Sequence, residues 1–141
     1  MLIAVDFDGT IVQHEYPKIG KEIPFAVETL KRLQSEFHHL LVLWTMRDGK
    51  ELEEAVEFCR ARGLEFYAVN ASYPEEIFED GMSRKVNADL FIDDRSLGGL
   101  PDWGVIYRMI ADEKHLEPPK NELQSEYANR KKGFFQSLFG R

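Results

Sequence analysis

Residues 2–10 read LIAVDFDGT, and this stretch decides the fold. Its first four residues are all apolar, a run too short for a helix and typical of a buried strand. The run stops at Asp6, and a second acid, Asp8, follows two residues later. The stretch therefore predicts a buried strand whose carboxyl end carries two carboxylates and a glycine-containing turn.

Outward from this strand, short apolar runs alternate with segments of helical periodicity. The further strand-like runs are 40–44, 66–69 and 90–92. Helical spacing of apolar residues follows Pro24, a second helix is predicted from Asp48 to about Gly63, and residues 105–110 belong to a final core helix. Strands that are apolar throughout, alternating with helices, predict an α/β fold: a three-layer α/β/α sandwich with a Rossmann-like, mostly parallel sheet and right-handed crossovers.

Composition limits the class of protein. The chain has 141 residues, of which 43% are hydrophobic and 30% charged, as expected of one globular domain. The single cysteine, Cys59, has no internal disulfide partner and fits a reducing compartment. No apolar stretch reaches the roughly 20 residues that span a bilayer, and the acidic N-terminus does not resemble a signal peptide. We therefore expect a cytoplasmic protein.

Charge divides the chain into a body and a tail. Pro118-Pro119 marks a break, which predicts a core over 1–117 and a tail over 118–141. The last 22 residues carry five basic and two acidic residues, whereas the rest of the chain carries a net charge of −10. Residues 130–141 combine basic and aromatic side chains, which suits either contact with an anionic membrane or a protein, or a plain terminus packed on the body.

Polar side chains gather where the predicted strands end. In open parallel sheets, ligands bind beyond the carboxyl ends of the strands. Beyond the first strand, these ends carry Thr45, Arg47, Asp93, Asp94 and Arg95. Several ionised carboxylates cannot lie close together without a cation. Mg²⁺ is a hard cation that binds carboxylate and phosphate oxygens, so it is the metal that we expect here.

A carboxylate at such an edge can also be a nucleophile. Attack on phosphorus would form an aspartyl phosphate on Asp6 or Asp8, while the other carboxylate handles a proton. Gly9 would let the backbone turn sharply after the strand. The first strand end is therefore a candidate phosphoryl-transfer site.

Four motifs in order carry a family resemblance. VDFDGT, the strand-end threonine of LLVLWT, the lysine of SRK and the acid pair of LFIDD resemble the haloacid dehalogenase-like hydrolase superfamily, most of whose members are phosphatases. The resemblance covers about residues 1–112, and the first motif is its specific part. It implies a Mg²⁺-dependent phosphoric monoester hydrolase rather than a dehalogenase, because dehalogenases usually lack the second aspartate.

The resemblance implies a role for each matching residue. Asp6 is the nucleophile and a metal ligand; Asp8 is the general acid–base and a metal ligand through its carbonyl. Thr45 binds the phosphoryl group, Lys85 neutralises charge, and Asp93 and Asp94 hold Mg²⁺ directly or through water. For Asp94 an indirect or helix-capping role stays open, and Arg84 competes with Lys85. The candidate substrate contacts are Gly9, Thr10, Arg47 and Arg95; for both arginines a surface ion pair is the alternative.

The gaps between motifs leave no room for the usual cap domain. Capless relatives often act on large substrates or gain a lid by oligomerising, so a phosphorylated macromolecule is one expectation. FIDDRS also resembles nucleic-acid 3′-phosphatases, although the net charge of −7 disfavours nucleic acid. A phosphotransferase, or a non-catalytic module that binds Mg²⁺ and a phosphorylated ligand, remain alternatives. His14 reads as a solvated loop residue.

Overall fold

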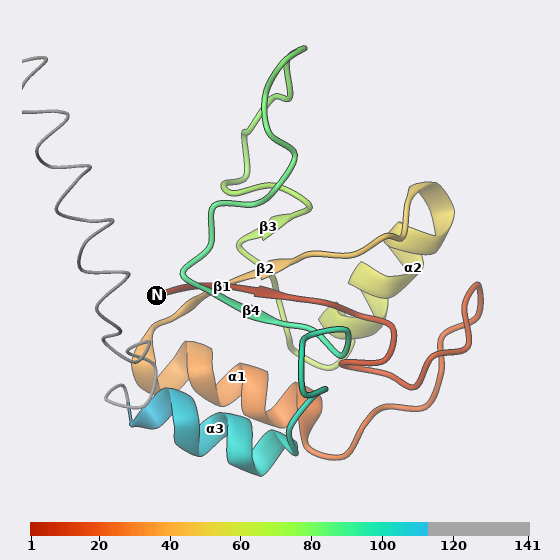
Figure 1. Cartoon of the computed structure of the whole chain (residues 1–141). Coiled ribbons are helices and arrows are strands. Elements are labelled where there is room, and N and C mark those ends of the chain that lie inside the picture. The colour runs from red at the N-terminus through yellow and green to blue at the C-terminus, as the bar shows by residue number, and fades with distance from the viewer. Residues whose placement is uncertain (113–141) are drawn as a thin grey trace, which may run out of the picture. The chain divides into compact units, whose positions relative to one another are not determined.

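A computed structural model describes residues 1–112 of the chain (Figure 1). The elements are β1 (Leu2–Val5), α1 (Ala26–Phe37), β2 (Leu40–Leu43), α2 (Gly49–Arg60), β3 (Ala68–Val69), β4 (Leu90–Ile92) and α3 (Trp103–Ala111). The chain divides into two compact units, Met1–Tyr107 and Arg108–Arg141. The first unit holds the sheet and is described below. The predicted boundary after residue 117, and with it the basic tail, lies outside the described residues.

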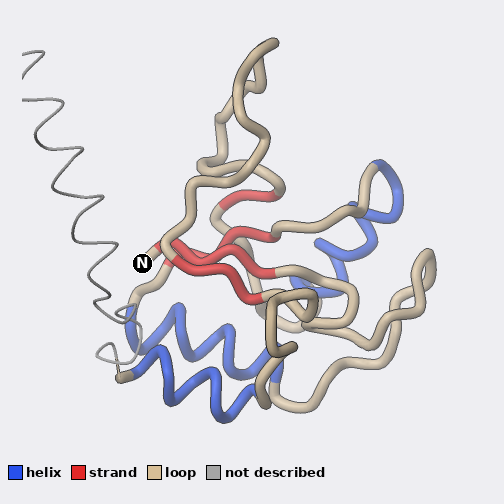
Figure 2. Tube along the Cα trace, in the orientation of Figure 1, coloured by secondary structure: helices blue, strands red, loops and turns tan. Residues whose placement is uncertain are grey.

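The four strands form one parallel sheet in the order β3-β2-β1-β4, which confirms the predicted α/β fold and places β1 between two neighbours. Figure 2 shows the strands at the centre, joined by helices and long loops. The ladder pairs Val5 with Leu43 on one side and with Ile92 on the other. Three strands therefore end at the same level, and the polar residues that follow them share one edge.

One face of the sheet packs against helices. Figure 1 shows α1 and α3 on the same side of the strands. Arg32 of α1 lies over the Tyr107 ring of α3, with the guanidinium carbon 4.2 Å from the ring centroid. The turn that follows α2 also reaches α1, because Lys31 Nζ donates to the carbonyl of Arg62 at 3.1 Å. Consecutive right-handed crossovers that move in one direction across a sheet place their helices on one face, as α1 and α2 are placed here.

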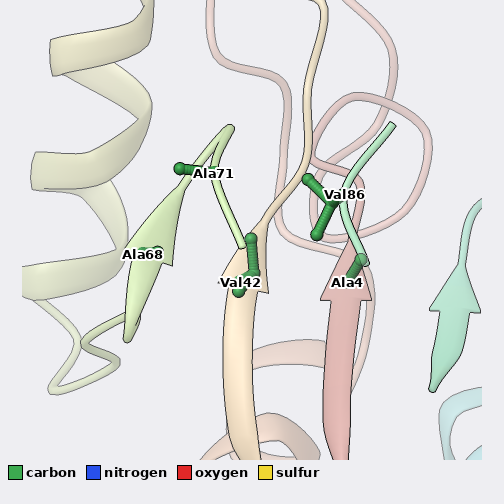
Figure 3. Close-up of a cluster of buried hydrophobic side chains, with 5 residues drawn as sticks. All are labelled: Ala4, Val42, Ala68, Ala71 and Val86. Carbon is green, nitrogen blue, oxygen red and sulfur yellow. The ribbon is translucent and has the colours of Figure 1, made fainter. Parts of the chain in front are cut away.

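The opposite face carries a loop where the sequence predicted a second helical layer. A cluster of small buried side chains covers it: Ala4, Val42, Ala68, Ala71 and Val86 (Figure 3). Residues 70–89, which join β3 to β4, contain neither helix nor strand. Pro74, Gly81 and a run of charged residues interrupt the apolar periodicity that a helix needs to bury a face. The second helical layer of the expected sandwich is thus absent from residues 1–112.

The helix ends differ slightly from those predicted. The side chain of Asp48 accepts a hydrogen bond from the Gly49 amide at 2.8 Å, so α2 begins where expected. In contrast, α1 begins at Ala26, after Phe25 in a left-handed conformation without a side-chain cap. Within residues 1–112 no helix is both long and apolar enough to cross a membrane.

Residues 11–23 form a small flap after the first strand end. Gln13 N donates to the carbonyl of Lys21 at 2.8 Å, and Ile23 N donates to the carbonyl of Ile11 at 2.8 Å. These bonds hold the flap as a narrow, hairpin-like loop. Neither the flap nor residues 46–84 hold a domain-sized insertion, so the described part of the chain has no cap domain.

The flap depends on a close approach of two backbones at Gly20. A Cβ at this position would lie 1.9 Å from the carbonyl oxygen of Gln13, which cannot move without breaking the pairing. We expect Gly20→Ala to lower the free energy of unfolding by about 2 kcal/mol in urea denaturation. Gly104→Ala is the matched control: its Cβ would lie 3.1 Å from a side-chain oxygen of Asp102, and a helical alanine should leave stability within about 0.5 kcal/mol of wild type. Equal stabilities for the two variants would contradict this account of the flap.

Candidate metal-binding active site

A cleft of about 650 Å³ lies at the carboxyl edge of the sheet. Its lining contains six of the ten residues that the sequence singled out: Asp6, Asp8, Thr45, Arg47, Asp93 and Arg95. They come from the ends of β1, β2 and β4, which the parallel ladder aligns at one level. The predicted meeting of these strand ends is therefore confirmed.

Three aspartates form a potential metal site. One carboxylate oxygen from each of Asp6, Asp93 and Asp94 lies within 4.8 Å of the others. The pairing of β1 with β4 holds them together, since the Asp6 amide donates to the carbonyl of Ile92 at 3.0 Å. A half-buried set of three carboxylates suits a hard divalent cation that prefers oxygen ligands.

The carboxyl group of Asp6 is strongly perturbed. Its pKa is raised from 3.8 to about 7, chiefly by burial; the charges of Asp93 and Asp94 contribute in the same direction, and a hydrogen bond from the Phe7 backbone opposes the shift. Neutral pH therefore leaves the metal-free cluster poised to hold a proton on Asp6. A divalent cation at the same position would favour the ionised carboxylate and displace that proton.

The second aspartate of the motif is held by an arginine. Both oxygens of Asp8 accept hydrogen bonds from Arg47, from Nε and from Nη2, each at 2.7 Å. Arg47 is only 2% exposed, and its remaining N–H groups donate to the carbonyls of Pro17, Lys18 and Glu51. With its donors so occupied, Arg47 positions Asp8 and the flap and is not a free substrate contact, nor is it the surface ion pair of the alternative reading.

Glycine and threonine of the first motif support Asp94. A Cβ at Gly9, whose φ is +83°, would lie 2.3 Å from Asp94 Oδ2, so only glycine fits. Thr10 is fully buried; its hydroxyl accepts from the Asp94 amide at 3.1 Å, and its carbonyl accepts from Trp103 Nε1 at 3.1 Å. The expectation that Thr10 contacts substrate is therefore wrong, because Thr10 is fully buried and its hydroxyl is bonded to Asp94.

Thr45 has a partner that the sequence did not indicate. Its amide donates to the side-chain oxygen of Asn70 at 2.8 Å, and its hydroxyl accepts from the Arg47 amide at 3.2 Å. Asn70 follows β3 in a left-handed conformation with φ 48°, which asparagine tolerates better than most residues. An asparagine directly after a strand was the only sequence signal for this role.

Lys85 lies away from the cleft lining. Its Nζ is 5.2 Å from the ring centroid of Phe91, and the residue is exposed. The segment that carries it is anchored on the second face of the sheet by Val86. Arg95, also exposed, lines the cleft that contains Asp93 and is the cation there that Asp8 does not bind. The structure thus brings Arg95, but not Lys85, to the predicted site.

Four further residues line the cleft: His14, Tyr16, Trp44 and Met46. His14 and Tyr16 belong to the flap, whereas Trp44 and Met46 flank Thr45. The sequence treated His14 as a solvated loop residue and did not single out the other three for binding. The flap brings His14 and Tyr16 to the cleft, whereas Trp44 and Met46 reach it from the end of β2.

The ion pair between Asp8 and Arg47 should dominate the stability of the site. Arg47→Met leaves Asp8 unpaired in a cleft that also contains Asp6 and Asp93, so we expect a loss of about 3 kcal/mol in urea denaturation. Arg95→Met, the same change at an exposed position of the same cleft, should shift stability by less than about 0.5 kcal/mol. Similar losses of unfolding free energy in the two variants would contradict the view that the buried Asp8–Arg47 ion pair stabilises the fold more than an exposed arginine does.

The raised pKa of Asp6 predicts a pH dependence. Between pH 3.8 and about 7, folded Asp6 retains a proton that the unfolded chain releases, so the stability of the metal-free protein should fall as pH rises through this window. Thermal melts in EDTA from pH 4.5 to 8 should show this fall in wild type and in Asp80→Asn, an exposed acid outside the cleft, and less of it in Asp6→Asn. An unchanged profile in Asp6→Asn would contradict the assignment.

Comparison with known proteins places the chain in a family without indicating its activity. No protein-family model and no curated protein matches it. A solved structure of a conserved protein from Bacteroides thetaiotaomicron is 67% identical, covers 80% of this chain and 91% of its own, and superposes with a TM-score of 0.75. At this identity and coverage, the chain belongs to the same family as that conserved protein of Bacteroides thetaiotaomicron.

Proposed function

We propose that the protein is a Mg²⁺-dependent phosphatase that works through a phosphoryl group on Asp6. The observation that carries the proposal is the convergence of Asp6, Asp93 and Asp94 at the edge of the sheet, in a cleft that also contains Thr45. The haloacid dehalogenase-like motifs of the sequence support the same assignment. In this view the described residues are a reduced, capless version of that fold.

The acids of the cleft, Thr45 and Arg95 each have a part in the proposed reaction. An oxygen of Asp6 attacks phosphorus, and the bond from phosphorus to the leaving oxygen breaks; water then attacks the phosphoryl group, releasing phosphate and restoring the carboxylate. Bound Mg²⁺ would neutralise charge on the carboxylates and on the phosphoryl oxygens. Thr45 donates to a phosphoryl oxygen, and Arg95 takes the charge-neutralising role that the resemblance assigned to Lys85.

The Asp8–Arg47 pair bears on the proton transfers. As general acid–base, Asp8 would give a proton to the leaving oxygen and later accept one from water. In the arrangement observed, both Asp8 oxygens accept from Arg47, so this work requires the pair to loosen when substrate binds.

The Asp8–Arg47 pair also favours a second candidate function, that of a non-catalytic binding module. A protein that keeps Asp8 locked would bind Mg²⁺ and a phosphorylated ligand without turning it over, as a regulatory module does. Trapping distinguishes the two: a phosphoenzyme that contains labelled phosphate and is cleaved by hydroxylamine supports the phosphatase or a phosphotransferase. Label on an added acceptor, in place of free phosphate, indicates the phosphotransferase.

The principal test is release of inorganic phosphate from a panel of phosphate esters, including a 3′-phosphorylated oligonucleotide and a phosphopeptide. We expect release with Mg²⁺ that EDTA abolishes and that Asp6→Asn lowers by roughly a thousandfold or more. Asp80→Asn, exposed and outside the cleft, should retain wild-type rates. Full activity in Asp6→Asn would exclude the proposed nucleophile.

A further inference from the structure

The apolar part of the cleft has no role in the proposed reaction. Tyr16, Trp44 and Met46 line it together with the acids, yet none of them is a ligand that Mg²⁺ prefers, and the proposed reaction assigns them no step. Tyr16 is 55% exposed and Met46 is 96% exposed. Large apolar side chains held in the open beside a polar reaction centre indicate a surface for a ligand.

The ring of Tyr16 is fixed in place. The guanidinium carbon of the buried Arg47 lies 5.2 Å from its ring centroid, and Arg47 also binds the carbonyls of the next two residues, Pro17 and Lys18. Arg47 therefore holds both the Tyr16 ring and the backbone that follows it. A ring anchored in this way loses little freedom when a ligand stacks on it.

The two residues next to Met46 hold its backbone in place. Thr45 is bonded to Asn70 and Arg47 is buried, so the two residues on either side of Met46 are both anchored. The methionine follows directly on the residue proposed to bind the phosphoryl group. A thioether at this position can contact the edge of an aromatic ring attached to that phosphate.

We infer that the substrate is a small phosphate ester whose leaving group carries a planar aromatic ring, which lies against Tyr16 and Met46 while its phosphate meets Asp6 and Thr45. This inference rests on the proposed function and specifies its substrate class. A cleft of about 650 Å³ is the size of a small-molecule site. A nucleoside monophosphate and a simple arylalkyl phosphate share this chemistry.

Two matched pairs of substrates test the ring without changing the reacting group. Benzyl phosphate is compared with cyclohexylmethyl phosphate, and adenosine 5′-monophosphate with ribose 5-phosphate, in the full chain with Mg²⁺. We expect kcat/KM to favour the aromatic member by about tenfold in at least one pair, chiefly through KM, because only the aromatic ring can stack on Tyr16 and contact the Met46 thioether. The pair that shows the preference identifies the source of the ring.

Variants link the preference to the proposed surface. Tyr16→Leu and Met46→Ala should each reduce the aromatic preference several-fold, whereas Tyr16→Phe should retain it. Melting temperatures of the variants establish that the flap is intact. Equal kcat/KM values within both pairs, or an aromatic preference that survives in Tyr16→Leu, would overturn the inference.

Binding separates this inference from the proposed function. If no ester is hydrolysed, calorimetric titration of the same four compounds into the Mg²⁺-loaded protein still measures the preference. Tighter binding of the aromatic members would then support the surface while the phosphatase proposal fails. Phosphate release without aromatic preference, or strongest turnover of the phosphopeptide or oligonucleotide irrespective of aromatic content, would leave the phosphatase standing and exclude this substrate class.

Discussion

The parallel pairing of β1 with β4 is the constraint on which the site depends. It aligns Val5 with Ile92, so the residue after each strand, Asp6 and Asp93, emerges at one level of the sheet. The carboxylates of Asp6, Asp93 and Asp94 then lie within 4.8 Å of one another. Burial, together with the repulsion of these like charges, raises the pKa of Asp6, and a cation at this place would be stabilising.

On the other side of β1, Arg47 connects the ends of β1 and β2 by binding Asp8. It neutralises Asp8 with two hydrogen bonds and ties the flap and the start of α2 to the same point through backbone carbonyls. One buried side chain therefore sets the position of the second motif aspartate and of the Tyr16 ring. The two acids of the first motif thus have different surroundings: Asp6 belongs to the cluster that suits a metal, and Asp8 is bound by Arg47.

The covering of the sheet explains why Lys85 departs from its expected place. On the face occupied by α1 and α3, large side chains fill the space between helices and strands. On the other face, small residues such as Ala4 and Val42 meet a loop, whose anchor Val86 adjoins Lys85. The lysine therefore rests on Phe91, while Arg95, which follows the acid pair directly, reaches the cleft.

The sequence by itself determined the parallel α/β sheet and the acids at its carboxyl edge, because apolar runs that end in polar residues are local signals. It also indicated Thr45 and Arg95, since strand ends of parallel neighbours must meet. Tertiary structure alone decided that Arg47 binds Asp8, that Thr10 is sealed behind Asp94, and that Asn70 holds Thr45. It also decided that Tyr16 and Met46 form part of the cleft. These contacts join residues distant in the chain or depend on the path of a loop, and no periodicity or spacing encodes the path of a loop.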